Sequence, residues 1–265
     1  MIVDIQFNQG SAPWSRMREA VIAADSAGYG TIWNLDHFSG EMFGSDSMHE
    51  CFTSLTAWAA VTERADIGTL VTNVNNRHPG LLANIVSSIQ DVSGGRLLLG
   101  IGAGASPNSP FGAEQRALGI EMLPTMAQRH QRLVDAVGTM RSIWAHDRDE
   151  SYTGFPRPIA EPPIIAGVNS VELARIAGRT LDGINARFNH PDRGMFLRTA
   201  HEASGHRDDF DLSVWCPFDQ DLADPDHPFH REIASEGANR LIMLHAGPPD
   251  PDVIARVGAE IAKNF

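Results

Sequence analysis

The sequence predicts an α/β protein that folds as a single (β/α)8 barrel of the TIM type, and three observations support this. Short continuous apolar runs alternate with segments of helical periodicity, which implies parallel strands joined by right-handed crossovers. Eight such units follow one another along the chain. The length of 265 residues agrees with the roughly 250 residues typical of one such barrel. We therefore expect one domain over residues 1–265, with no internal boundary.

Each strand is expected where an apolar run ends at a turn. The eight runs cover residues 3–7, 31–35, 65–72, 97–101, 164–167, 183–187, 212–216 and 241–245. Short, nearly continuous apolar runs are typical of parallel strands that are buried on both faces. The run Leu97–Ile101 is the clearest example.

The helical segments lie between these runs. They cover residues 14–27, 49–64, 80–92, a long pattern after 112 that ends near 144, 171–180, 191–204 and 252–263. Ser15 is a candidate N-cap of the first helix. Proline at position 79 marks the entry to the third helix, and Gly94-Gly95 can end it in a left-handed conformation. The connection 217–239 has only a weak helical pattern, and the proline-rich stretch 152–163 is expected to be a loop.

The composition limits the classes of protein to consider. A net charge of -12 argues against a nucleic-acid partner, because neutralising phosphates requires a basic surface. The two cysteines, Cys51 and Cys216, form neither a disulfide framework nor a metal-ligand spacing, so we expect a reducing, cytoplasmic setting. No signal-peptide pattern opens the sequence and no apolar run approaches membrane-spanning length, so no membrane partner is expected.

A glycine-rich segment, Ser93–Gly104, points to a ligand site. Gly102 and Gly104 leave the backbone bare at the C-terminal end of a predicted strand, where α/β barrels bind their ligands. A plain turn would explain these glycines equally well, because their conformational freedom also serves turns.

An ordered series of motifs links this segment to a known family. The motifs are Asp36-His37-Phe38, residues 55–64, Gly68–Thr72, Arg77-His78-Pro79, Ser93–Arg96 with Leu99–Gly102, Pro162–Gly167 and Asp182–Asn185. In this order they resemble the bacterial-luciferase-like oxidoreductases, which use FMN or the deazaflavin coenzyme F420. The resemblance covers most of residues 1–190 and rests on the series, since no single motif is diagnostic. It implies a luciferase-like barrel whose substrate-covering insertions are shortened after the seventh strand.

The resemblance implies a flavin- or F420-dependent oxidoreductase or monooxygenase. Such an enzyme would bind coenzyme F420 or FMN at the barrel mouth, for hydride transfer or oxygen activation on a small organic substrate. The Asp36-His37-Phe38 motif favours F420. A non-catalytic flavin-binding protein of the same fold is the alternative, because Ala105 stands where some deazaflavin-dependent dehydrogenases carry a glutamate. A homodimer is compatible with the resemblance.

A metal-dependent barrel hydrolase ranks lower. The first predicted strand offers Asp4 and Gln6 but no His-x-His, and no metal-ligand spacing occurs elsewhere. No metal is therefore expected.

His37 is the expected catalytic residue. Histidine can give or take a proton near neutral pH, and the resemblance places His37 beside the reactive carbon of the cofactor ring. Asp36 is its neighbour, and adjacent strand residues point to opposite faces, so we expect Asp36 to brace the loop. A capping aspartate and a packing histidine would explain the pair without a cofactor.

The resemblance assigns the cofactor contacts to the ends of four strands. The expected cofactor-binding residues are Asp36, Leu70, Val71, Thr72, Asn73, Gly102, Ala103, Gly104, Gly167, Val168, Asn169 and Ser170. In the family a non-prolyl cis peptide forms a bulge behind the ring, and it would fall here between Leu70 and Val71. Residues 167–170 precede a predicted helix and would hold a phosphate, although a simple N-cap explains Asn169 or Ser170 equally well.

Three further residues are candidate substrate contacts: Arg187, Trp215 and His245. Arg187 could neutralise an anionic group, and a surface salt bridge is about as plausible for it. Arg96 begins its strand at the opposite end of the barrel and is expected to be structural. Trp33, Trp58 and Trp144 are expected in the core, and Glu50 at a helix start.

Overall fold

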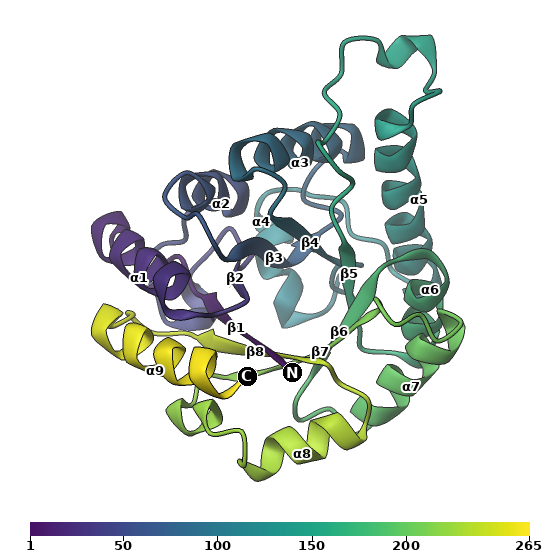
Figure 1. Cartoon of the computed structure of the whole chain (residues 1–265). Helices are drawn as coiled ribbons and strands as arrows, with labels where there is room; N and C mark the ends of the chain where they lie inside the picture. Colours follow the sequence, from purple (N-terminus) through teal and green to yellow (C-terminus); the bar gives the residue numbers. More distant parts are fainter.

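The computed structural model describes residues 1–265 and shows a closed barrel of eight parallel strands (Figure 1). The strands are β1 (Ile2–Phe7), β2 (Thr31–Asn34), β3 (Asp66–Asn73), β4 (Leu97–Gly102), β5 (Ile164–Gly167), β6 (Gly183–Arg187), β7 (Asp211–Pro217) and β8 (Arg240–His245). Each strand pairs with the next, and β8 pairs with β1 over six residues to close the barrel. The predicted fold is confirmed, and every predicted strand end lies within one residue of the observed end.

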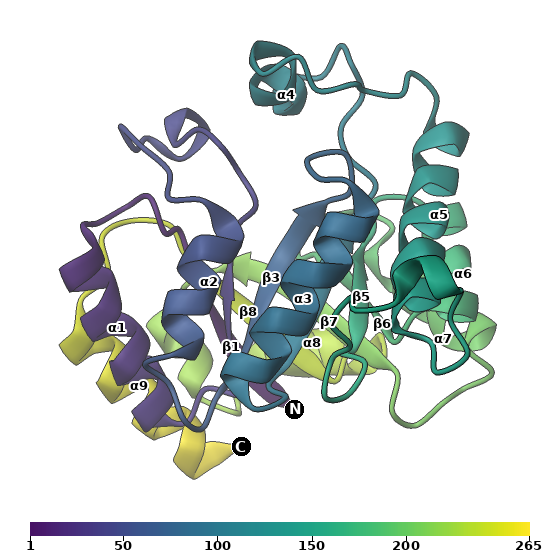
Figure 2. The same cartoon turned by 90° about the horizontal axis from the view of Figure 1, so that it is seen from above.

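The chain forms nine helices. They are α1 (Trp14–Ala27), α2 (Cys51–Ala59), α3 (Pro79–Ser93), α4 (Ala113–Ala117), α5 (Met126–Trp144), α6 (Val171–Thr180), α7 (Arg193–Ala203), α8 (Pro228–Ser235) and α9 (Pro251–Asn264). Eight of them surround the strands, while α4 lies above the mouth of the barrel. Four short 3-10 helices lie in the connections: η1 (Glu41–Phe43), η2 (Pro110–Gly112), η3 (Glu150–Tyr152) and η4 (Gln220–Ala223). Both chain termini lie at the end of the barrel opposite α4 (Figure 2).

The helix predicted over residues 49–64 is too long, because α2 ends at Ala59. The chain then turns towards the Asp25 carboxylate, which accepts hydrogen bonds from the backbone N–H groups of Glu63, Arg64 and Ala65 at 2.8–3.0 Å. This contact comes from α1, almost forty positions away, so local periodicity carries no sign of it.

The long helical pattern after Gly112 is also wrong, because two helices occupy it. Gly119 adopts a left-handed conformation with φ of +67°, which ends α4. Thr125 and Gln128 then form a capping box that starts α5.

Caps settle the smaller questions about helix ends. Ser15 is not the N-cap of α1, because Pro13 occupies that position and makes no side-chain cap bond. The predicted entry to α3 is confirmed: His78 Nδ1 accepts from the N–H of Gly80, and Gly94 is the left-handed C-cap. The weak pattern over 217–239 contains η4 and α8.

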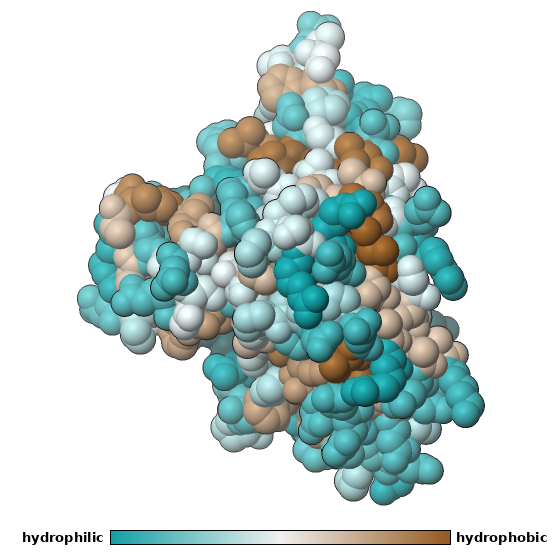
Figure 3. Space-filling view, turned by 90° about the vertical axis from the view of Figure 1, so that its left-hand side faces the viewer, coloured by the Kyte–Doolittle hydropathy of each residue, from teal (hydrophilic) through white to brown (hydrophobic).

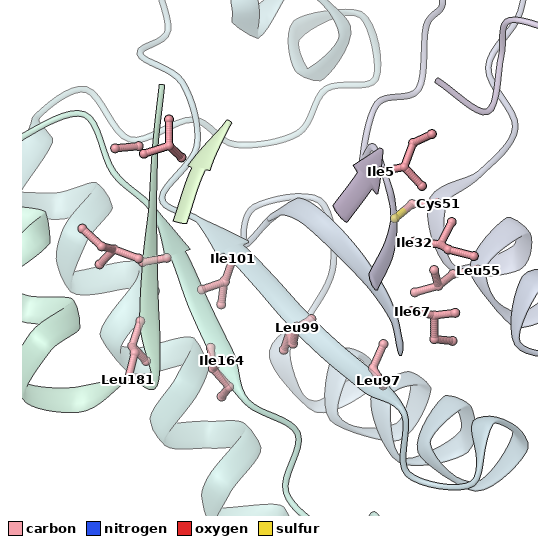
Figure 4. Packing of buried hydrophobic residues seen from close by; sticks show 14 of the residues in the cluster. Ile5, Ile32, Cys51, Leu55, Ile67, Leu97, Leu99, Ile101, Ile164 and Leu181 are labelled. Atoms are coloured by element: carbon pink, nitrogen blue, oxygen red, sulfur yellow. The ribbon is translucent and has the colours of Figure 1, made fainter. Parts of the chain in front are cut away.

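Two separate hydrophobic clusters fill the protein. The larger one contains 56 buried residues and joins the outer faces of the strands to the helices (Figure 4). Leu97, Leu99 and Ile101 alternate along β4 towards these helices, and Leu98 points the other way, into the barrel. The predicted core positions of Trp33, Trp58 and Trp144 are confirmed.

The smaller cluster fills the barrel itself. It consists of Trp33, Leu70, Leu98, Ile165 and Ile242, with Val71 and Trp215 packed against it. A Cβ on Gly68 would lie 2.5 Å from the Trp33 ring, so this glycine makes room for the indole. Side chains therefore fill the interior of the barrel, and a ligand can bind at the C-terminal end of the strands.

The surface is mixed in character. The face over the left-hand side of Figure 1 is mainly hydrophilic, with hydrophobic atoms in several separate groups (Figure 3). No helix combines the length and the apolar character that crossing a bilayer requires.

Candidate functional site

A cavity of about 540 Å³ opens at the C-terminal mouth of the barrel, within the range usual for small-molecule sites. Half of its 24 lining residues are hydrophobic. It is lined by Gln6, Leu35, Asp36, His37, Met42, Phe43, Leu70, Val71, Asn73, Gly102, Ala103, Gly104, Ala105, Phe111, Glu114, Gln115, Gly167, Val168, Asn169, Leu173, Asn185, Arg187, Trp215 and Leu244. The predicted rim residues from β2, β3, β4 and β5 thus meet in one place.

Three predicted site residues do not line this cavity. Thr72 is fully buried in β3, and its hydroxyl pairs with that of Thr69 at 2.7 Å. The Ser170 hydroxyl accepts from the N–H of Leu173 and is the N-cap of α6. His245 packs against the rings of Phe7 and Phe218.

The Asp36 carboxylate braces the loop after β3. It lies 2.9 Å from both terminal nitrogens of Arg77, in a two-pronged ion pair, and it also accepts from the N–H of Asn73. Arg77 also forms an ion pair with Glu50, whose side chain caps the N-terminus of α2. Burial disfavours the charge on Arg77, but these carboxylates outweigh it and raise the Arg77 pKa. The ion pair between Asp36 and Arg77 therefore fixes two rim loops to each other.

His37 lies beside Asp36 but faces a different partner. Its Nδ1 is 2.8 Å from Oε1 of Glu114 on α4, and the ring of Phe43 packs edge-on against the imidazole at 5.0 Å. Its Nε2 makes no hydrogen bond within the protein. The expected division of roles between Asp36 and His37 agrees with this geometry.

Val71 and two glycines form the inner part of the cavity. The peptide bond between Leu70 and Val71 is cis, which confirms that prediction. A Cβ on Gly102 would lie 2.7 Å from one Val71 methyl carbon, and a Cβ on Gly167 would lie 3.0 Å from the other. Both positions therefore favour glycine because the Val71 side chain occupies the space between β4 and β5.

Gly104 needs its glycine for two reasons. Its φ is +81°, in the left-handed region, and a Cβ would lie 2.1 Å from Nδ2 of Asn75. The chain can therefore leave β4 close to the loop after β3, which keeps the cavity open beside Gly102.

Gln6 ties the strands together beneath the cavity. Its amide nitrogen donates to the carbonyl oxygen of Leu70 at 2.6 Å, and its amide oxygen accepts from Nε1 of Trp215 at 2.5 Å. The predicted pocket residue Trp215 thus has a fixed ring, over which the Arg187 guanidinium lies at 5.6 Å.

Arg187 carries the only unpaired charge in the cavity. Asp36 is paired with Arg77, and Glu114 with His37, whereas the guanidinium of Arg187 forms no ion pair and no hydrogen bond within the protein. The surface salt bridge considered for it from the sequence does not form. An exposed, unpaired guanidinium at the rim favours an anionic group on a ligand.

Several lining residues were not predicted from the sequence. Glu114 and Gln115 reach the cavity from α4, while Met42, Phe43 and Phe111 come from the 3-10 helices η1 and η2. The break at Gly119 and Pro124 signals that residues before it form a separate short element. Nothing local to residue 114 indicates a contact with residue 37.

Other reactive groups lie away from this chemistry. Burial raises the pKa of Cys51 well above its usual value and that of Cys216 to about 12, so neither is a nucleophile at neutral pH. No group of three or more His, Cys, Asp or Glu side chains is placed to hold a metal ion. Arg96 donates to the carbonyls of Ala59, Thr62 and Ala65, so its structural role is confirmed.

Known proteins share both the sequence and the fold. An F420-dependent glucose-6-phosphate dehydrogenase of Microbacterium testaceum is 30% identical over 173 residues, which is 61% of this chain and 49% of that protein. The chain thus spans about half the length of this relative. One of the same description from Nakamurella multipartita is 25% identical over 268 residues, 93% of this chain and 76% of that protein.

Solved structures agree in fold at lower identity. A coenzyme F420-dependent tetrahydromethanopterin reductase from Methanopyrus kandleri superposes with a TM-score of 0.75 at 15% identity, over 99% of this chain and 98% of that one. The monooxygenase RslO1 from Streptomyces bottropensis gives 0.78 at 18% identity, over 100% and 98%. The family profile of the luciferase-like monooxygenases matches residues 3–218 of the sequence. The chain therefore belongs to the luciferase-like monooxygenase family of oxidoreductases.

Proposed function

We propose that this protein binds the deazaflavin coenzyme F420 at the mouth of the barrel and catalyses hydride transfer between it and a small organic substrate. The observation that carries the proposal is the convergence on one cavity of His37, Val71, Gly102 and Gly167. The F420-dependent dehydrogenases among the relatives of this protein favour F420 over FMN.

The residues of the cavity suit a flat, partly polar ring system. Leu70 and Val71 present an apolar surface on top of the barrel cluster, and Trp215 continues that surface. His37 and Asn73 add polar groups at the edge. An apolar pocket with a few fixed polar groups binds and orients such a ligand.

An anionic part of the cofactor would lie near β5 and β6. Asn169 and Leu173 line this part of the cavity at the N-terminal end of α6, where a helix favours an anion. Gly167 of β5 pairs with Asn185 of the neighbouring strand β6, and Arg187 is the last residue of β6. An anion here would gain both the helix terminus and an unpaired guanidinium, although Glu172 in the first turn of α6 weakens the helix contribution.

F420 supplies a ring carbon that accepts or gives up a hydride, and the protein supplies position and charge. His37 can hold or release a proton through Nε2, the ring nitrogen without a protein partner. Asp36 keeps the loop that carries His37 in place through Arg77. Met42, Phe43 and Phe111 add apolar side chains to the lining of the cavity.

Fluorescence titration of the purified protein with F420 and with FMN tests the cofactor. We expect F420 to bind at least tenfold more tightly, a difference of about 1.4 kcal/mol. Tighter binding of FMN would reverse the assignment and favour oxygen activation on a flavin.

Turnover separates an enzyme from a flavin-binding protein. The alternative without catalysis is suggested by Ala105, which lines the cavity at the position where the resemblance implies a glutamate in some deazaflavin-dependent dehydrogenases. With F420 bound, oxidation of a panel of alcohols or reduction of a panel of carbonyl compounds is expected for at least one compound. Binding of F420 without turnover of any compound, in either direction, would support the alternative.

A further inference from the structure

The short helix α4 stands above the barrel mouth, away from the ring of larger helices (Figure 2). Two consecutive residues attach it to the rim. Glu114 contacts the loop after β2, and Gln115 donates from Nε2 to Oδ1 of Asn76 in the loop after β3 at 3.1 Å. Its position therefore depends on polar contacts with the two loops that carry His37 and Asn76.

Four donors converge on the Glu114 carboxylate. Oε2 accepts from the backbone N–H groups of Phe38 and Ser39 at 2.7 and 3.0 Å. Oε1 lies 2.8 Å from Nδ1 of His37 and 3.3 Å from Nε2 of Gln115. The Glu114 side chain is only 8% exposed, so these contacts replace most of its hydration.

This set of donors decides which group carries the proton. Burial opposes the charge on Glu114, but the hydrogen bonds from His37, Phe38 and Ser39 outweigh it and hold the Glu114 pKa below its usual range. An ionised carboxylate only accepts hydrogen bonds. The contact at 2.8 Å therefore requires the hydrogen to be on Nδ1 of His37.

We propose that Glu114 is a positioning residue for the reaction, which keeps the hydrogen of neutral His37 on Nδ1 and so leaves the Nε2 lone pair free towards the cavity. The inference rests on the proposed function for its catalytic part, while the tautomer itself is a property of the protein alone. Neutral imidazole has one donor and one acceptor nitrogen, so fixing Nδ1 as the donor fixes Nε2 as the acceptor. The ring of Phe43 also packs against the imidazole, with the two ring centroids 5.0 Å apart.

The carboxylate at the cavity does not come from the end of β4. The position after Gly104 is Ala105, which also lines the cavity. A carboxylate nevertheless reaches the cavity from α4, nine positions later in the chain. It acts through His37, because its four acceptor sites are used by protein donors.

The first test is nitrogen NMR of the ligand-free protein at about pH 8, above the usual histidine pKa of about 6.5. The chain has 11 histidines, so the His37 signals are assigned by their loss in His37→Asn. We expect a protonated Nδ1 and an unprotonated Nε2. A protonated Nε2 in the wild-type protein would overturn the proposal, whatever cofactor binds.

The second test is the variant Glu114→Gln, with Glu121→Gln as the matched control. Glu121 lies in the same excursion of the chain, its side chain is 74% exposed, and it pairs only with Arg132. An amide at position 114 can present its NH2 to Nδ1, which favours the opposite tautomer of His37. We expect that change in the spectrum of Glu114→Gln and a wild-type spectrum for Glu121→Gln.

The kinetic result follows from the same tautomer change. We expect turnover of Glu114→Gln to fall by roughly 10²-fold, the usual scale of a displaced proton-transfer group, with less than a threefold change in F420 affinity. An unchanged tautomer, or a changed tautomer with wild-type turnover, would refute the positioning role. Failure of F420 to bind the wild-type protein would refute the proposed function and leave the NMR result to decide the tautomer.

Discussion

The two ends of the barrel both carry charged side chains, but these are paired with each other at one end and partly unpaired at the other. At the N-terminal end, Arg240 lies 2.7 Å from Asp4 and 2.5 Å from Asp211, and Nε1 of Trp33 donates to Asp4 at 2.8 Å. At the C-terminal mouth, Nε2 of His37 and the Arg187 guanidinium form no hydrogen bond within the protein, and the guanidinium contacts only the Trp215 ring. The charges at the first end stabilise the fold, and the free groups at the second are available to a ligand.

The difference in burial agrees with this division. Asp4 is completely buried and Arg240 is 8% exposed, whereas Arg187 is exposed. Burial raises the pKa of Asp4 and of Asp211, and the contacts with Arg240 oppose the rise in both. A buried pair of this kind is costly to break from one side, whereas an exposed group costs little to replace.

The largest expected effect comes from breaking the ion pairs of Arg240 at the N-terminal end of the barrel. Arg240→Met leaves Asp4 and Asp211 buried without their cation, so we expect a loss of roughly 3–5 kcal/mol in the free energy of unfolding. Urea denaturation measures it. Arg132→Met removes an exposed pair with Glu121 and is the control, with an expected loss of about 0–1 kcal/mol. Equal losses in the two variants would show that the buried ion pairs at the N-terminal end stabilise the fold no more than an exposed pair does.

The next largest effect is expected at the C-terminal mouth of the barrel, on turnover. His37→Asn is expected to lower turnover by roughly 10²-fold or more, because a positioned proton-transfer group is lost. The side chain of His37 is 26% exposed and contributes little core packing, so the melting temperature should stay nearly constant. Calorimetry and steady-state kinetics give the two values. An unfolded variant, or one with normal turnover, would show that His37 serves the fold and not the reaction.

Arg187 allows a smaller test of the open end. In Arg187→Gln we expect FMN to bind about tenfold more weakly, a loss of about 1.4 kcal/mol, because the variant removes the guanidinium that we propose as the partner of a phosphate. Riboflavin has no phosphate, so its affinity should not change. Arg175→Gln, which removes an exposed cation paired with Glu172 on α6, should leave both affinities unchanged. Equal losses for FMN and riboflavin would contradict the assignment of Arg187 to an anion.

The smallest effect is the response of the mouth to acid. Because hydrogen bonds lower the Glu114 pKa in the folded protein, its stabilising contribution is complete above the unfolded pKa of about 4.3 and is lost as the pH falls through the lower folded value. Hydrogen exchange of the Phe38 and Ser39 amides should therefore accelerate below roughly pH 4, relative to Glu114→Gln. Identical pH profiles for the two proteins would mean that Glu114 does not hold this loop.

The strands and the rim were predictable because their signals are local. A parallel strand is apolar along its whole length, so Leu97–Ile101 and Ile164–Gly167 can be located without any knowledge of their neighbours. The end of each strand then places Asp36, Asn73 and Gly102 at the same rim, as observed. The assignment of roles to these residues came from the family resemblance.

What sequence reasoning missed depends on contacts between distant residues. Asp25 ends α2 early by binding residues 63–65, and Glu114 binds His37 across 77 positions. Thr72 and Ser170 were expected at the ligand, but they meet Thr69 and the N–H of Leu173. Such pairings follow from the closed barrel and not from local spacing. The expected homodimer stays a prediction.

The most direct test of the central claim, that the open end is a cofactor site organised around His37, is nitrogen NMR of the wild-type protein during titration with F420. We predict that the His37 ring signals shift as F420 binds. The signals of His130 and His230, which do not line the cavity, should stay in place. Binding of F420 without a shift of His37, or binding of FMN when F420 does not bind, would contradict the account.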